Sequence, residues 1–107
     1  MTKSLVRTFP PVEAGNGVTR RVLSDSPDLM VVEFRFAKDG IGTLHSHPHI
    51  QATYVLSGRF EFTIGDEVVL VSPGESFVIP SLATHGCRAL EDGVLIDTFT
   101  PRRDDFL

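Results

Sequence analysis

The chain has 107 residues, of which 41% are hydrophobic, and this content supports one hydrophobic core but not two. A net charge of −4 offers no basic surface for a phosphate backbone, and no apolar run approaches the roughly 20 residues that span a bilayer, so neither nucleic acid nor a membrane is an expected partner. The first residues lack the apolar stretch of a secretory signal, and a single cysteine, Cys87, fits a reducing compartment, so we expect a cytoplasmic protein.

Taken in chain order, the sequence predicts short strands separated by turns. Residues 1–20 carry prolines and glycines among polar residues, which predicts an irregular arm with one short strand at its start. In residues 29–36 every even-numbered side chain is apolar, whereas Val31, Glu33 and Arg35 stand between them, which is the pattern of a half-buried strand whose even-numbered positions face the core. Further strands are expected in the histidine-containing segment that ends at Leu56, and at 60–64, 68–71, 76–79, 85–90 and 94–100.

No window of a dozen residues has a helical period of 3.6, whereas turn signals recur every few residues. This rhythm is typical of an all-β sandwich or barrel, and it does not by itself choose the topology. Aromatic side chains of the predicted strands are interpreted as core residues rather than as surfaces that stack on sugars, namely Tyr54, Phe60, Phe62 and Phe77.

The four histidines of the chain lie in two places. His45, His47 and His49 fall within five residues, and His85 stands alone. In extended backbone, His45 and His47 would point to the same face and present two imidazoles to one ion, and Gln51 has the same parity. The pattern predicts a transition-metal site. The alternative is a histidine pair on a solvated strand, since the common zinc motifs use other spacings.

Two motifs give a resemblance to a known family. The spacing of His45, His47, Gln51 and a later glycine resembles the first motif of the cupins, and residues 74–85 resemble the second, with a glycine, a proline and His85 in matching places. Most cupins have glutamate where this chain has Gln51. The sequence also departs from the usual motifs in turns, at Gly40, Leu82 and Ala89.

This resemblance implies an all-β protein that folds as a single-domain cupin jelly-roll β-barrel over residues 1–107. Residues 1–20 would form an N-terminal arm, residues 28–100 the barrel and residues 101–107 a C-terminal tail. One divalent transition metal would be bound in the mouth of the barrel by four side chains, those of His45, His47, Gln51 and His85. Because Pro48 breaks the strand beside it, His49 is expected to support the ligands rather than to bind the ion.

Three imidazoles and one amide are all neutral when bound, so the ion would keep its full double charge. This favours Lewis-acid chemistry over the oxygen chemistry of iron sites that include a carboxylate. The ligand types do not choose among nickel, zinc, manganese and iron. Cys87 lies two residues beyond His85 and could approach the metal, but it is interpreted as a buried, inert thiol.

A closer resemblance includes the run that contains Asp97, Phe99 and Arg103 and covers roughly residues 40–107. It is similar to the KdgF-type cupins of pectin and alginate degradation. That resemblance implies metal-dependent opening of the ring of 4,5-unsaturated monouronates to linear keto acids, with Asp97, Phe99 and Arg103 beside the substrate. From the residues alone, Asp97 either points inward on the last strand or lies exposed at the rim. Arginines available to meet an anionic ligand are Arg59, Arg88, Arg102 and Arg103.

Two other functions are compatible with these motifs. One is a metal-dependent cupin dioxygenase, which oxygen uptake by the iron-loaded protein would reveal. The other is a non-enzymatic cupin that binds a sugar acid, which would show ligand binding without turnover. In each case the partner is a small molecule, most simply a sugar acid, and the resemblance implies a homodimer.

Overall fold

The computed structural model describes residues 6, 7 and 9–107, and the strand expected at the very start of the chain falls outside them. No helix in this described part is long and apolar enough to cross a membrane. The elements are β1 (Val12–Glu13), β2 (Val18–Ser26), β3 (Leu29–Phe36), β4 (Ile41–His45), β5 (Ile50–Ser57), β6 (Phe60–Ile64), β7 (Glu67–Val71), β8 (Ser76–Ile79), β9 (His85–Ala89), β10 (Gly93–Thr100) and a short 3-10 helix, η2 (Asp104–Phe106).

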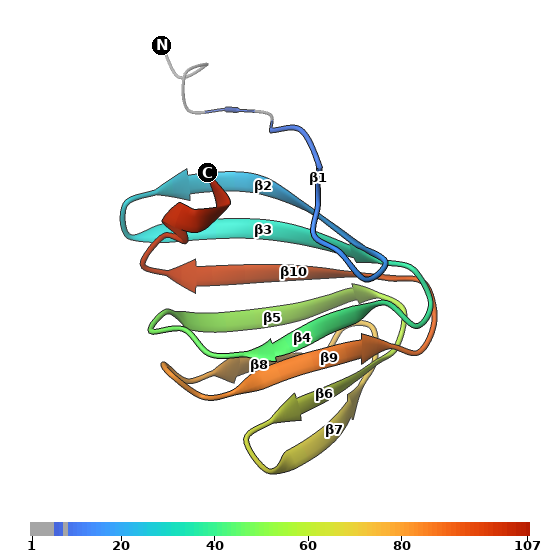
Figure 1. Ribbon diagram of the computed structural model, residues 1–107. Coiled ribbons are helices and arrows are strands. Elements are labelled where there is room, and N and C mark those ends of the chain that lie inside the picture. The colour runs from blue at the N-terminus through green and yellow to red at the C-terminus, as the bar shows by residue number, and fades with distance from the viewer. Residues whose placement is uncertain (1–5, 8) are drawn as a thin grey trace.

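The strands form two antiparallel sheets, as Figure 1 shows. A six-stranded sheet has the order β1-β2-β3-β10-β5-β8, and a four-stranded sheet has the order β4-β9-β6-β7. This arrangement confirms the predicted all-β jelly roll. Among the described residues the two sheets are not joined by a hydrogen-bonded strand pair, so the barrel is a pair of facing sheets rather than a closed cylinder.

Alternating side chains on the inner faces of the sheets build the core. On β3 the even-numbered residues Met30, Val32 and Phe36 are buried, as the sequence pattern predicts. One apolar cluster gathers around Phe60, and a second, smaller one joins β2 and β3 to Phe99 of β10. Each fully buried side chain of this size contributes about 1.5–3 kcal/mol through removal of apolar surface from water.

The strand β2 was not predicted and begins ten residues before the expected start of the barrel at residue 28. Its inward positions are Val18, Arg20 and Val22, of which the two valines are buried in the core. Because a charged side chain stands between them, the alternation that marks a strand is interrupted in the sequence. Together with β1, which pairs with it, β2 extends the six-stranded sheet to residue 12.

The histidine-containing segment forms two strands, which belong to different sheets. The strand β4 ends at His45 in the four-stranded sheet, and β5 starts at Ile50 in the six-stranded sheet. Pro48 lies between them and has no N–H to donate to a ladder. The prediction that Tyr54 is a core residue was wrong, because it lies on the outer face of β5 and is 42% exposed.

Candidate metal centre

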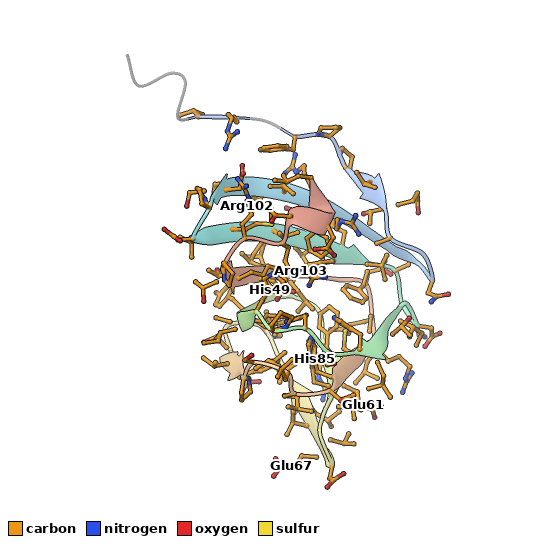
Figure 2. All side chains as sticks on the ribbon, turned by 60° about the vertical axis from the view of Figure 1, so that its left-hand side comes forward. His49, Glu61, Glu67, His85, Arg102 and Arg103 are labelled. Atoms are coloured by element: carbon orange, nitrogen blue, oxygen red, sulfur yellow. The ribbon has the colours of Figure 1, made fainter. Side chains whose placement is uncertain are left out.

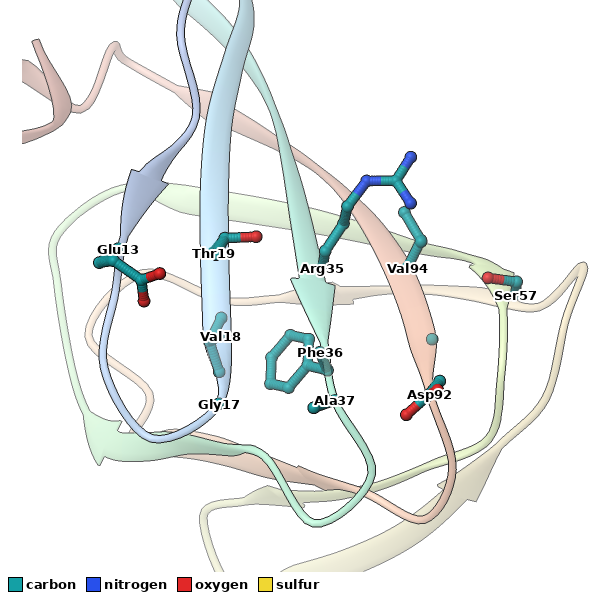
Figure 3. Close-up of a pocket in the computed structure, with 11 residues that line it drawn as sticks. Glu13, Gly17, Val18, Thr19, Arg35, Phe36, Ala37, Ser57, Asp92 and Val94 are labelled. Atoms are coloured by element: carbon teal, nitrogen blue, oxygen red, sulfur yellow. The ribbon is translucent and has the colours of Figure 1, made fainter.

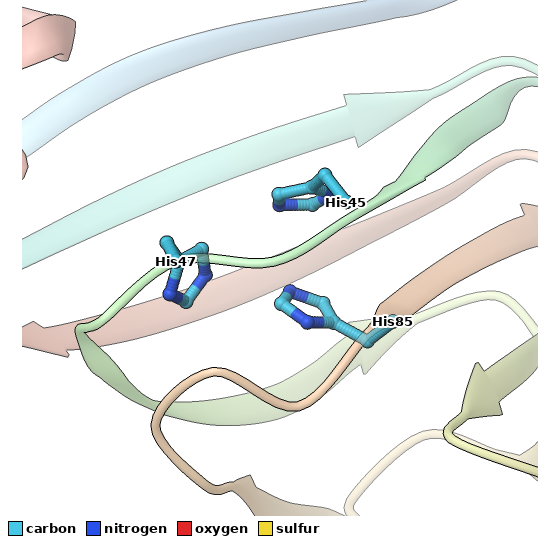
Figure 4. A group of neighbouring side chains, drawn as sticks. All are labelled: His45, His47 and His85. Atoms are coloured by element: carbon cyan, nitrogen blue, oxygen red, sulfur yellow. The ribbon is translucent and has the colours of Figure 1, made fainter.

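Three histidines meet where the two sheets approach each other. His45 ends β4 and His85 begins β9, and the two are directly opposite in the register of these strands. His47 follows in the connection to β5. Ring nitrogens of the three side chains all lie within 4.8 Å of one another. Figure 4 shows the three rings gathered between the strands that carry them. In common zinc motifs, two ligands lie a few residues apart in the sequence. Here the pairing of β4 with β9 brings two distant histidines together instead.

Each of these imidazoles is oriented by a backbone carbonyl. The carbonyl oxygens accept hydrogen bonds from the Nδ1 atoms, from His45 to Thr43 over 2.7 Å, from His47 to His49 over 3.0 Å and from His85 to Ala83 over 2.9 Å. A carbonyl oxygen can only accept, so Nδ1 carries the proton and Nε2 keeps its lone pair. This support of a ligand's second nitrogen is usual at metal sites.

The histidine cluster contains buried acceptors that a cation would satisfy. Nε2 of His85 is buried and has no hydrogen-bond partner among the described residues. Nε2 of His47 lies 3.1 Å from the Oε1 atom of Gln51, although its Nδ1 already faces a carbonyl. A neutral imidazole donates only one hydrogen, whereas a cation would satisfy both Nε2 and Oε1. The donor set therefore fits a divalent transition metal.

Burial favours the neutral form of two of the imidazoles, those of His47 and His85. It lowers the pKa of His85 to about 4, against the smaller opposing effect of its hydrogen bond to Ala83. It also lowers the pKa of His47. Neutral imidazole is the form that binds metal, so at neutral pH no proton has to be displaced from these two side chains.

Gln51 is held in place by a neighbour that the sequence analysis did not single out. Its Nε2 atom donates to the hydroxyl of Thr53 over 3.0 Å, which turns the amide oxygen toward the histidines. Thr53 is fully buried two residues along β5, so it shares the inner face with Gln51. The sequence did contain a signal for this contact. Thr53 lies two residues from Gln51 and so has the same parity, and a buried threonine in a strand requires a polar partner.

His49 and Cys87 lie near the three histidines but are not among the proposed ligands. The carbonyl of His49 accepts from His47, and its Nε2 lies 3.2 Å from the carbonyl oxygen of Arg102, so it braces the loop rather than joining the cluster. Cys87 lines the nearby cavity, and burial raises its pKa to about 12. A protonated thiol is a poor ligand and a poor nucleophile, which agrees with the expectation of an inert side chain.

A cavity of about 320 Å³ opens beside the histidines, between the two sheets. Its lining includes His45, His85 and Gln51 together with the three residues expected beside a substrate, Asp97, Phe99 and Arg103. A larger hollow of about 560 Å³, shown in Figure 3, is lined mainly by β2, β3 and the ends of β10 and contains none of the histidines. Ligand chemistry therefore belongs to the smaller cavity.

Asp97 points inward and is not at the rim. It lies opposite Thr53 in the register of β10 and β5 and is 5% exposed, and its Oδ1 atom has no hydrogen-bond partner among the described residues. Burial raises its pKa to about 7, while hydrogen bonds with Thr53 and Gln51 and the charge of Arg103 act in the opposite direction. A carboxyl group with this pKa can both accept and return a proton near neutral pH.

Phe99 and Arg103 form one wall of the cavity. Phe99 is buried, and its ring centroid lies 5.8 Å from that of His47. The guanidinium carbon of Arg103 lies 5.2 Å from the Phe99 ring centroid. Arg103 and His85, both labelled in Figure 2, line the same space. The other arginines considered from the sequence do not line it, namely Arg59, Arg88 and Arg102.

The fold and this site are those of a cupin. The family model described as "Cupin domain" matches residues 32–99, and the chain belongs to the cupin family. It is 44% identical over 100 residues to the pectin degradation protein KdgF of Dickeya dadantii (strain 3937), and this match covers 92% of the chain and 91% of that protein.

Solved structures agree with this assignment. The structure of KdgF from Halomonas sp. matches with a TM-score of 0.88 and 39% sequence identity, covering 94% of this chain and 98% of that one. An RmlC-like cupin from Shewanella frigidimarina NCIMB 400 matches with a TM-score of 0.89 and 34% identity, covering 92% of this chain and 89% of that one.

Proposed function

We propose that this chain is a metal-dependent cupin that opens the ring of 4,5-unsaturated monouronates, giving linear keto-deoxyuronates in the breakdown of pectin or alginate. The observation that carries the proposal is the 44% identity, over nearly the whole chain, to a protein named for pectin degradation. The cavity supports it, because a buried carboxyl group and an arginine lie beside the histidine cluster. Residues 1–107 would act as one domain in the cytoplasm.

His45, His47, Gln51 and His85 would hold one divalent ion, whether nickel, zinc, manganese or iron. When bound, such an ion supplies Lewis-acid stabilisation of negative charge on sugar oxygens. The convergence of three imidazoles and the buried, unpartnered Nε2 of His85 support this assignment. No carboxylate is needed among the ligands.

The side chains of the cavity would then carry out the proton transfer. Asp97 takes the proton from the anomeric hydroxyl as the ring C–O bond breaks, and returns it to the carbon of the former double bond. The reaction is an isomerisation, so atoms balance without a second substrate or a redox cofactor. Phe99 excludes water from one side of the ring, and Arg103 adds positive charge near the carboxylate.

The direct test is an absorbance assay. Purified, metal-loaded protein mixed with unsaturated galacturonate should accelerate the loss of the double-bond absorbance. Asp97→Asn should abolish this acceleration, because the amide cannot take up the proton, while the bound metal measured by elemental analysis stays the same. Decay at the rate of the protein-free control would overturn the proposed function, as would full activity of Asp97→Asn.

A further inference from the structure

A second arginine lines the cavity beside the histidines. Arg20 reaches it from β2 and Arg103 from the segment after β10. Both guanidinium carbons lie 4.2 Å from the ring centroid of Phe106, which belongs to η2. The aromatic ring of the C-terminal segment therefore holds two cationic groups at the same end of one small cavity.

The two arginines differ in what they already bind. Arg103 donates from Nε and Nη2 to the two carboxylate oxygens of Asp105, over 3.0 and 2.8 Å, so one edge of its planar group is occupied. Arg20 forms no ion pair with any carboxylate in residues 6, 7 and 9–107, and its Nε is buried without an acceptor. A buried cationic donor without an acceptor is costly.

Arg20 places a charge at a position of β2 that faces the core, where its guanidinium group contacts the ring of Phe106. Arg20 stands on the inner face between two buried valines, where an apolar residue would continue the core. The next residue, Arg21, faces outward and lies 3.7 Å from Glu33, so its charge is paired within the protein. The charge of Arg20 lacks such a partner and faces a cavity that can hold a small molecule.

The same cavity contains a buried acceptor without a partner, Oδ1 of Asp97. A ligand that satisfies both groups must present an anionic oxygen pair to a guanidinium and a hydroxyl to a carboxyl group. A monosaccharide acid has both in one molecule. A neutral sugar lacks the first, and a simple fatty acid lacks the second.

We propose that Arg20 is the residue that recognises the substrate carboxylate and so restricts the site to acids over neutral sugars and esters. This inference rests on the proposed function for the identity of the substrate. Arg103, held by Asp105, contributes its remaining N–H groups and positions Phe106. Arg20 offers the planar edge that a carboxylate binds in bidentate fashion.

The test compares Arg20→Met with Arg21→Met, which removes an outward-facing arginine from the neighbouring position. With unsaturated galacturonate, Arg20→Met should raise KM about 10- to 100-fold, as expected for loss of a charge-assisted hydrogen bond, with a much smaller effect on kcat. The preference for the acid over its methyl ester should fall by the same factor. Arg21→Met should leave both quantities unchanged, and Arg20→Lys should be intermediate because it keeps the charge but loses the fork.

Equal KM values and equal acid-to-ester ratios for wild type and Arg20→Met would overturn the inference, provided that circular dichroism and metal content show a folded, loaded variant. If that variant does not fold, the acid-to-ester ratio of Arg20→Lys tests the inference in its place.

If wild type does not turn over the unsaturated sugar, the proposed function fails separately, and calorimetry then tests whether Arg20 binds a carboxylate. Saturated D-galacturonate should then bind to wild type and bind at least tenfold more weakly to the Arg20→Met or Arg20→Lys variant, while D-galactose binds neither. No binding of galacturonate to wild type would overturn both.

Discussion

At the scale of single residues, the site contains a row of neighbouring side chains, each in contact with the next. Gln51 donates to the hydroxyl of Thr53, and Thr53 lies directly opposite Asp97 in the register of β5 and β10, so the proposed proton carrier and a proposed metal ligand adjoin the same buried threonine. A change in one of the three alters the surroundings of the other two. Their effects on activity are therefore expected to be non-additive.

The raised pKa of Asp97 predicts a pH-dependent stability in the metal-free protein. Its folded-state pKa of about 7 lies above the ordinary 3.8, so the folded protein keeps a proton that the unfolded chain releases. The resulting stabilisation is complete below pH 4 and is lost as the pH rises through 7, with a size of up to about 4 kcal/mol. Asp97→Asn should remove this loss.

Urea unfolding in chelator at pH 4 and pH 8 checks this prediction. The free energy of unfolding of Asp97→Asn, relative to wild type, should be higher at pH 8 than at pH 4. Titration of His85 contributes equally to both proteins and cancels in the comparison. Parallel pH curves for the two proteins would mean that Asp97 ionises at its ordinary pKa.

At the scale of elements, the turns decide how the two sheets meet. Gly58 joins β5 to β6 with a φ of +77°, and a Cβ atom there would lie 2.5 Å from the carbonyl oxygen of Asp92 and 2.6 Å from the Cα atom of Gly93. Gly65 joins β6 to β7 with a φ of +59°, but a Cβ atom there would meet nothing within 4 Å. Substitutions at these two glycines therefore distinguish the cost of backbone strain alone from the cost of strain combined with steric contact.

Gly58→Ala is expected to lower the free energy of unfolding by about 3 kcal/mol or more, since it adds a clash with backbone atoms to the left-handed strain. Gly65→Ala should cost only about 1 kcal/mol, the strain alone. Chemical denaturation of both variants beside wild type measures the difference. Equal losses would show that the turn after β9 moves aside at little cost.

Much of this arrangement was predictable from the sequence, and the exceptions have a physical cause. The bounds of β3 follow from its apolar even-numbered positions, and the four proposed ligands follow from the resemblance to the cupin motifs. The strand β2 and the cavity residue Arg20 were missed together, because a buried charge at an inward position hides the strand that carries it. The ion pair of Arg103 with Asp105 depends on a side-chain geometry that spacing does not determine.

At the scale of the whole molecule, the outer face of the six-stranded sheet predicts association of two copies. Tyr54, Leu56 and Val78 are 42%, 51% and 62% exposed on this face, and apolar surface of this kind is commonly covered by a partner. Light scattering should give twice the chain mass of 11.8 kDa. Val78→Glu should yield monomer, whereas Val68→Glu, at a position 60% exposed on β7, should not. A monomeric wild type would contradict the expected homodimer.

Metal binding should also stabilise the whole fold, because the proposed ligands come from both sheets. His45 and His85 belong to the four-stranded sheet, and Gln51 belongs to the six-stranded one. An ion bound by the folded chain but not by the unfolded chain adds about 2.7 kcal/mol at a concentration 100 times Kd, which corresponds to a rise in Tm of roughly 10–15 °C. Thermal unfolding in chelator and in excess nickel, zinc, manganese or iron measures this rise and ranks the metals. The His85→Ala variant should lose the metal-dependent rise in Tm, whatever its own Tm without metal. If none of these metals changes the Tm of wild type, the result would contradict a metal site that links the two sheets.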